Sequence, residues 1–600
     1  MANQTIARQE AEITQSQTWE SAQEETPTVS NRRLMIIMVS VLLGILLAAL
    51  DQTIVGPALP KIIGDLKGFD HYAWVVTIYL LTSTIPVPII GKMTDTYGRK
   101  WFFLAGIAVF ILGSALSGLS WNIYSLIGFR GVQGLGAGIL FASAFAIIAD
   151  LIPPRDRGKW QGVFGAVWGL AAVIGPTIGG QLTDNLSWHW VFYVNVPIGL
   201  VALAVLFFTF PNETRHTTNK VIDVWGALAL TASLGPLLLA LSLGRDWGWT
   251  SALTIGMFAA SALFMAAFLF IEARANDAAI IPLDLFKSRI FVVSAIVVFV
   301  TGMGLFGAVL YIPLFIQAIQ GDSATSSGNA LTPMMLSLVA ASIISGQVIS
   351  RTGRYWIMGV IGMGLVTLGA FLLYTMTMTT DRLTTIEYMV LLGLGMGITF
   401  PLYTLVVQNA FTIARVGVVT ATVQFFRSVG STVGVAVLGS LVNNQFHEAF
   451  PQEFANKLNA LKETLPGPIA ATLKPEQFLQ GLSNLDPQAL VSPQGAAQLQ
   501  AQLISHGVPA QFAPSIMGVI TDAMRPALFS GIQQAFLIGA ILLGVGFVAT
   551  IFLPEIALRK TNQVPQPAMA EGGAVAAHGQ PTGTGVALPE AHTNGWQHDL

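Results

Sequence analysis

Asp51 is the acidic side chain that lies deepest in an apolar run of this sequence, about two-thirds of the way along residues 34–59. A carboxylate at such a depth costs at least about 2.5 kcal/mol on insertion scales, so it is expected to have a function. Burial favours the neutral form, which lets the group take up and release protons. The alternative is an acid near a helix end that reaches outward to the headgroups. We favour the proton-exchanging carboxylate.

Arg130 and Gln133 are the polar residues that could face Asp51. Both lie near the start of the apolar run 124–150, at a depth close to that of Asp51 if each helical residue rises about 1.5 Å. An arginine beside a carboxylate stabilises the charged form and so opposes the effect of burial. The pair could be a purely structural ion pair. We favour a proton-coupling set made of Asp51, Arg130 and Gln133.

Residues 91–100 form a basic, glycine-bounded segment that is predicted to be a loop between two apolar runs. A weaker version of it recurs at residues 346–354. Since inner loops of membrane proteins are generally basic, the informative residues are the acid Asp95 and the glycines Gly91 and Gly98. A short turn used twice between hydrophobic helices indicates a duplicated membrane bundle.

Two contacts are expected around this loop. Arg99 should pair with Asp150, at the inner end of the run 124–150, and Asp95 should lie near the N-terminal end of the thirteenth span. The amino end of a helix is its positive end, so it attracts a carboxylate. These contacts would hold the two halves together on the cytoplasmic side and break when the protein opens inward.

Small residues and a proline cluster in the run 160–183, at Gly175, Pro176, Gly179 and Gly180. Small side chains allow helices to approach closely, and a proline removes one backbone hydrogen bond and permits a bend. Glycine in a membrane helix often serves packing alone, but the Gly-Pro-x-x-Gly-Gly arrangement also fits a gating helix.

The elements that must position these residues are membrane helices. The chain is 53% apolar and 10% charged, against roughly 25% charged for a soluble domain. A bilayer can accommodate so much apolar surface, and fourteen runs are long enough to cross about 30 Å of hydrocarbon. They lie near residues 34–59, 71–90, 101–119, 124–150, 160–183, 190–210, 224–244, 251–272, 290–317, 329–349, 356–376, 386–407, 419–443 and 526–554.

Most lysines and arginines fall on the side of the chain termini, which predicts that both termini are cytoplasmic. The predicted fold is an all-α membrane protein of two six-helix halves plus two inserted helices, with an extracytoplasmic segment before the last helix. The expected divisions are a disordered cytoplasmic tail (1–32), an N-terminal half (33–212) and an inserted pair of helices with its flanking loops (213–289). They are followed by a C-terminal half (290–555), which includes segment 444–525, and a second disordered cytoplasmic tail (556–600).

Composition also bears on other classes of site. Cysteine is absent and histidines are scattered, so neither a thiol nucleophile nor a metal site is expected. No nucleotide-binding loop is expected, because Gly91-Lys92 and Gly158-Lys159 are followed by Met93 and Trp160, not by Ser or Thr. The net charge of −2 argues against nucleic acid. An enzyme would need clustered ligands or a nucleophile–base pair in the spans, and none is visible. We therefore expect no cofactor and no enzymatic activity.

The motifs resemble those of the fourteen-span drug:proton antiporter family of the major facilitator superfamily, over nearly all of residues 33–443 and 526–555. The similar segments are Leu50 to Pro60, Gly91 to Lys100, Arg130 to Gly136, Gly162 to Gly180 and Trp188 to Pro197. The resemblance implies that Asp51 takes part in proton coupling, that Arg130 and its neighbours assist proton transfer, and that the glycine–proline cluster belongs to an exporter. It does not cover segment 444–525.

The prediction is a proton-driven, monomeric multidrug exporter of a bacterial cytoplasmic membrane, working by alternating access. With one deep acid, monovalent lipophilic cations or neutral compounds are the expected substrates. The pocket is expected to include Trp74, Tyr79, Trp168, Tyr311, Phe315, Tyr403, Gln424 and Phe425. Two alternatives remain open: a dedicated exporter of an endogenous lipid, siderophore or antibiotic, and a membrane sensor that does not transport.

Overall fold

In the computed structural model of the protein, residues up to Asn562 form one compact unit and residues from Gln563 form a second. The structure describes residues 30–66, 71–211, 222–275, 278–321, 324–412, 415–464, 499–500, 504 and 512–558. All of these belong to the first unit. The two tails expected to be disordered lie outside the described residues, except at residues 30–32 and 556–558.

Among the described residues, fourteen helices are long and apolar enough to cross a membrane, and no strand is present in those ranges. The predicted all-helical membrane fold is therefore confirmed. Two spans are interrupted, one between α3 (Tyr72–Thr84) and α4 (Val87–Tyr97) and one between α8 (Trp190–Tyr193) and α9 (Asn195–Thr209). The others are α2 (Asn31–Leu66), α5 (Lys100–Gly118), α6 (Ile123–Leu151), α7 (Pro154–Asn185), α10 (Val224–Trp247), α11 (Ala252–Ala275), α12 (Arg289–Ala318), α13 (Ala324–Thr352), α14 (Trp356–Tyr374), α15 (Arg382–Ala410), α16 (Val416–Thr464) and α21 (Ala513–Ile551).

The two halves repeat the same packing. In the first half α2 packs against α7 and α9, and α6 packs against α3 and α5. In the second half α12 packs against α16 and α21, and α15 packs against α13 and α14 in the same way. Each half has its own apolar core. The recurrence of helix order and partners is that of a parallel repeat, as the two glycine-bounded segments predicted.

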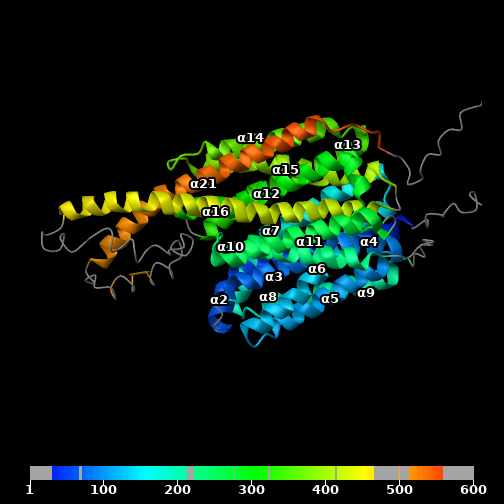
Figure 1. Cartoon of the computed structure of the whole chain (residues 1–600), viewed down its shortest axis with the longest axis horizontal. Helices are drawn as coiled ribbons and strands as arrows, with labels where there is room; N and C mark the ends of the chain where they lie inside the picture. The colour runs from blue at the N-terminus through cyan, green and yellow to red at the C-terminus, as the bar shows by residue number, and fades with distance from the viewer. Residues whose placement is uncertain are drawn as a thin grey trace, which may run out of the picture. The chain divides into compact units, whose positions relative to one another are not determined.

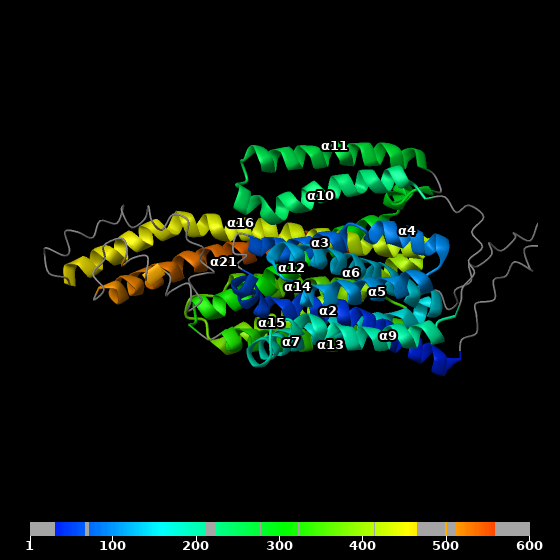
Figure 2. The ribbon, with the colours of Figure 1, turned by 90° about the horizontal axis from the view of Figure 1, so that it is seen from below.

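The inserted pair α10 and α11 lies side by side at the edge of the bundle, where α10 packs against α3 and α16 (Figure 2). Only 17% of the most apolar window of α11 is buried inside the protein. A helix with so much apolar surface left uncovered is suited to contact lipid. The pair therefore has an inner helix, α10, and an outer helix, α11.

Helices α16 and α21 extend beyond the rest of the bundle (Figure 1). The predicted thirteenth span ends at residue 443, whereas α16 continues to Thr464, and α21 begins at Ala513 rather than at residue 526. Phe446, Phe450 and Phe454 are buried and spaced by four, and their rings stack at 5.0 and 5.8 Å between centroids. Residues four apart share a helix face, so this apolar stripe belongs to the part of α16 that runs into the expected extracytoplasmic segment 444–525. Residues 465–498 of segment 444–525 lie outside the described ranges.

Candidate functional site: a buried carboxylate beside a central cavity

Asp51 forms a compact polar network with the two residues expected to face it. It lies on α2 with no exposed surface, and Nη1 of Arg130 on α6 donates to its Oδ2 at 2.6 Å. Nε2 of Gln133, one turn further along α6, donates to Oδ1 at 2.8 Å, and its Oε1 accepts from Arg130 at 2.9 Å. Arg130 and Gln133 are also buried. The structure thus brings Asp51, Arg130 and Gln133 together, away from water.

Asn195 is a further member of this network that the sequence reasoning did not assign. Its Nδ2 donates to Asp51 Oδ1 at 3.4 Å and to Oγ of Ser114 at 3.2 Å. Asn195 begins α9 at the interruption after α8 and is fully buried. An amide among apolar residues of a span was the available signal, because buried polar groups need partners. Amide and guanidinium donors together thus satisfy both oxygens of the buried Asp51 carboxylate.

The ring of Tyr79 packs against the guanidinium of Arg130 in this network. The guanidinium carbon of Arg130 lies 4.2 Å from the centre of the Tyr79 ring, a distance typical of a cation–π contact. The Tyr79 hydroxyl donates to the carbonyl oxygen of Ala48 on α2 at 3.3 Å. Tyr79 therefore holds Arg130 in place and does not line the central cavity, where it was expected.

The glycines of α7 set how closely that helix approaches α2. A Cβ on Gly175 would overlap Oγ1 of Thr53, and a Cβ on Gly179 would overlap the carbonyl oxygen of Ile54. A Cβ on Gly180 would meet nothing within 4 Å. Pro176 lies inside α7, between the two contacting glycines. The close α2–α7 contact therefore involves residues of α2 that follow Asp51 by two and three positions.

The segment expected to be a loop at residues 91–100 is mostly helical. Helix α4 runs to Tyr97, Gly98 ends it with φ of 92°, and α5 starts at Lys100. A positive φ is readily adopted only by glycine, which explains Gly98 at this sharp turn. The turn is shorter than predicted because the polar residues from 92 to 96 lie within the last turns of α4.

Asp95 links the two halves at this end of the bundle. Its carboxylate accepts hydrogen bonds from the backbone N–H groups of Gly417 at 3.1 Å and Val418 at 2.8 Å, in the first turn of α16. Nη2 of Arg99 donates to Asp95 at 2.9 Å, and its Nε lies 2.5 Å from Asp150 at the end of α6. Both contacts expected from the sequence are present. We call Asp95, Arg99, Asp150 and Gly417 the Asp95 gate.

Close packing surrounds the Asp95 gate. A Cβ on Gly91 would overlap the side chain of Ala421, so α4 and α16 touch there. A second pair of helices, α7 and α13, meets at Gly158 and Gly346, whose backbones leave no room for a Cβ. Ser350, in the second copy of the motif, donates to Asp156 in the first turn of α7 at 3.3 Å. The repeat therefore joins the halves twice at the same end.

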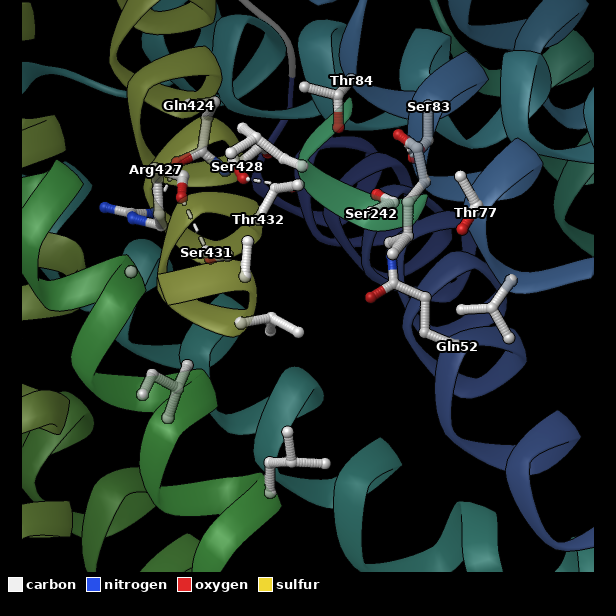
Figure 3. Close-up of a pocket in the computed structure, with 18 of the residues that line it drawn as sticks. Gln52, Thr77, Ser83, Thr84, Ser242, Gln424, Arg427, Ser428, Ser431 and Thr432 are labelled. Atoms are coloured by element: carbon white, nitrogen blue, oxygen red, sulfur yellow. Dashed lines mark hydrogen bonds between the residues drawn. The ribbon is translucent and has the colours of Figure 1, made fainter. Parts of the chain in front are cut away.

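A cavity of about 880 Å³ lies between the halves (Figure 3). Gln52, Thr77, Ser83 and Thr84 line it from the first half, and α16 lines it from the second. The inserted helix α10 contributes Ser242 and Trp247. Trp74 near the start of α3 and Trp247 at the end of α10 both lie at the end of their span opposite the Asp95 gate. The cavity thus reaches the helix ends that the gate does not close.

The expected pocket residues divide into two groups. Trp74, Trp168, Tyr311 and Gln424 line the cavity, whereas Tyr79, Phe315, Tyr403 and Phe425 do not. Phe315 is buried against Phe529, and Tyr403 bonds to Thr550 at 2.6 Å on the far side of α15. Phe425 belongs to an apolar cluster with residues of α10. These three have the right depth in the membrane, but their helices turn them away from the cavity.

Asp51 is also absent from the cavity wall, although its neighbour Gln52 is part of it. The carboxylate therefore lies behind the wall, inside the first half. In the described ranges, no group of three histidine or acidic side chains is arranged to hold a metal ion. The arrangement sets one shielded, ion-paired carboxylate next to a separate cavity whose volume lies in the range of small-molecule sites.

Comparison with known proteins identifies the family that has this architecture. The family described as the Major Facilitator Superfamily matches residues 41–228 and 224–435. The chain belongs to the Major Facilitator Superfamily. The superfamily consists of transporters, which agrees with the sequence-based expectation that the chain is not an enzyme. Solved structures share the fold at low identity: the proton:xylose symporter XylE has a TM-score of 0.52 and 12% identity, covering 88% of this chain and 98% of its own.

Two curated relatives within the superfamily are from Bacillus subtilis (strain 168). Multidrug transporter protein MdtP is 38% identical over 529 residues, which cover 87% of this chain and 93% of the relative. Multidrug resistance protein 3 is 35% identical, covering 90% of this chain and 99% of the relative. The similarity to multidrug efflux members of the Major Facilitator Superfamily, expected from the motifs, is confirmed.

Proposed function

We propose that this member of the superfamily exports lipophilic compounds across a bacterial cytoplasmic membrane in exchange for protons. The names of the two Bacillus relatives support drug efflux. The observation that carries proton coupling is Asp51, which is fully buried and held by Arg130 in the first half. A carboxylate that is buried yet ion-paired changes its contacts when it binds a proton, because the neutral acid no longer balances the arginine.

The excess of basic residues at the end of the Asp95 gate supports a cytoplasmic position for that end. With this orientation both termini are cytoplasmic, and the extension of α16 and α21 is extracytoplasmic. The structure then has its cavity directed outward and its cytoplasmic side closed by the gate. We propose that the protein works as a monomer, since each chain holds the complete cavity and carboxylate network.

The transport cycle follows from the positions of these groups. In the outward-directed form a proton reaches Asp51 and weakens its ion pair with Arg130. Because α7 touches α2 beside Asp51, the shift of α2 that follows protonation is passed to α7. The first turn of α7 is in turn hydrogen-bonded to α13 near the gate. Inward opening breaks the Asp95 gate, releases the proton to the cytoplasm and admits substrate. One proton moving down 100 mV supplies about 2.3 kcal/mol, which is equivalent to a concentration ratio of about fifty.

The test is proton movement in everted vesicles that hold the wild type or Asp51→Asn, challenged with a panel of lipophilic compounds. We expect substrate-triggered proton release in the wild type and none in the variant. Asp184→Asn is the matched control, because Asp184 is an exposed acid near the end of α7, and it should behave as the wild type does. Proton release that survives in Asp51→Asn would place the proton site elsewhere.

The predicted preference for monovalent cationic or neutral substrates followed from the presence of one deep acid, Asp51. Since Asp51 lies behind the wall, it offers no direct partner to a cation in the cavity. The charge preference therefore depends on the residues of the wall itself.

A further inference from the structure

Arg427 on α16 is the one charged residue in the described part of the cavity wall, which contains no aspartate or glutamate. The remaining polar wall is made of hydroxyl and amide groups. Ser428, Ser431 and Thr432 follow Arg427 along α16, and hydroxyl groups of the first half and of α10 lie opposite them (Figure 3). Such a wall donates hydrogen bonds and carries a single positive charge.

Among the described residues, no carboxylate balances the charge of Arg427. Its Nη1 donates to Oε1 of Gln424 at 2.5 Å and its Nη2 to the carbonyl oxygen of Phe400 at 3.1 Å. The guanidinium carbon lies 4.0 Å from the centre of the Phe400 ring. The side chain is 7% exposed, and its Nε is buried with no hydrogen-bond partner. No ion pair among the described residues includes it, in contrast to Arg99 and Arg130.

A guanidinium has five N–H groups that can donate hydrogen bonds. Only two neutral acceptors, Gln424 Oε1 and the carbonyl oxygen of Phe400, are hydrogen-bonded to Arg427 in the described structure. In a site of low dielectric constant an unbalanced charge is costly, and an anion supplied by a ligand would offset that cost. Gln424 lines the cavity beside Arg427, so an anionic group that took the place of its Oε1 would accept from Nη1 of the guanidinium. Phe400 lies against the guanidinium, and Trp74, Trp168 and Trp247 add flat apolar surfaces to the wall of the same cavity.

We propose that the cavity recognises aromatic lipophilic compounds that carry a carboxylate or another anionic group, and that Arg427 binds this group. The proposal rests on the proposed function in one respect, that the cavity is the transport site. It differs from the expectation of cationic or neutral substrates: in the described part of the wall a cation would meet Arg427 and no acid, whereas the anionic group of a substrate can bind the guanidinium through two N–H groups.

The test compares two dyes that share one fluorophore, rhodamine 110, which has a free carboxylate, and its methyl ester, rhodamine 123. Binding is followed by fluorescence polarisation with the full-length protein in phosphatidylcholine nanodiscs. We expect the wild type to bind the carboxylate about tenfold more tightly than the ester, the size typical of one hydrogen-bonded charge. Arg427→Gln should lose this preference and bind the ester at least as tightly, while Arg427→Lys should keep part of it.

Two further variants keep the experiment decisive. Arg351→Gln removes an exposed arginine at the end of α13 and should leave the preference unchanged. Gln424→Glu retains Arg427 and gives it an internal carboxylate, so it should also abolish the preference, even if Arg427→Gln fails to fold. Equal binding of the two dyes by the wild type, or a preference that persists in Gln424→Glu, would overturn the proposal.

The outcomes also separate this proposal from antiport. Arg427-dependent binding of the carboxylate without proton release in vesicles would support the anionic site and refute proton exchange. Proton release triggered by the ester alone would support exchange and overturn the anionic site.

Discussion

Asp95 and Gly417 join the two halves of the protein through one charge-assisted hydrogen bond, in which the carboxylate accepts from the backbone N–H of the helix start at 3.1 Å. The acid comes from the end of the second span and the donor from the first turn of the thirteenth. A carboxylate at the positive end of a helix is favoured, and here that end belongs to the opposite half. The same contact therefore stabilises the closed gate and must be lost on opening.

Asp95→Asn should weaken the closed form of the gate. The amide keeps the shape of the side chain but loses the negative charge, which is worth about 1–2 kcal/mol in such a hydrogen bond. Because the chain has no cysteine, Phe145→Cys can report opening: Phe145 lines the inner part of the cavity. We expect faster labelling by an impermeant maleimide from the cytoplasmic side in Asp95→Asn. Thr96→Ala, its neighbour on α4, is the control and should label at the wild-type rate.

Gly179→Ala and Gly180→Ala should differ sharply although they are adjacent. The new methyl group at residue 179 would overlap the carbonyl oxygen of Ile54, whereas the one at residue 180 would enter open space. Overpacking of this kind costs about 1–3 kcal/mol, so Gly179→Ala should lower the melting temperature and the transport rate. Gly180→Ala should change neither. Equal effects of the two variants, measured by thermal unfolding in detergent and by efflux, would contradict the proposed α2–α7 contact.

Trp247→Ala should alter the substrate range, because α10 contributes this ring to the cavity wall. Loss of a flat apolar surface should weaken binding of aromatic substrates by about tenfold, the effect of removing 1–2 kcal/mol of contact. Trp225→Ala, at the other end of α10 and 74% exposed, is the matched control. The measurement is a resistance profile over several compounds. An unchanged profile for Trp247→Ala would show that the inserted pair takes no part in recognition.

Phe450→Ala should destabilise the extension of α16 and α21. Phe450 is 3% exposed and stacks between Phe446 and Phe454, and truncation of a buried phenylalanine costs about 3–5 kcal/mol. We expect earlier protease cleavage in the extension, detected by mass spectrometry of the fragments. Glu448→Ala changes an exposed side chain of the same stretch and should leave the cleavage pattern as it is. Resistance of Phe450→Ala to cleavage would mean that the aromatic stack does not hold the extension.

The number of spans and the Asp51–Arg130 pair could be predicted because both depend on position along the chain. Hydropathy is a local property, and a helix rises by a constant amount per residue, so depth in the bilayer follows from residue number. Asp51, Arg130 and Gln133 share one depth and have complementary chemistry, which was sufficient to expect their contact. For the same reason the gate contacts of Asp95 and Arg99 could be anticipated from the helix ends on which they lie.

What the sequence by itself determined is thus the depth and chemical type of each residue, the repeat and the membrane fold. Only the tertiary structure decided the direction in which each side chain points, because packing between helices sets the rotation of each helix about its axis. Tyr403 and Phe315 have the depth of the cavity but face α21, and Arg427, one turn from Gln424, enters its wall. Rotation also placed Gln52 in the cavity and Asp51 behind it, which separates the proton site from the space for substrate.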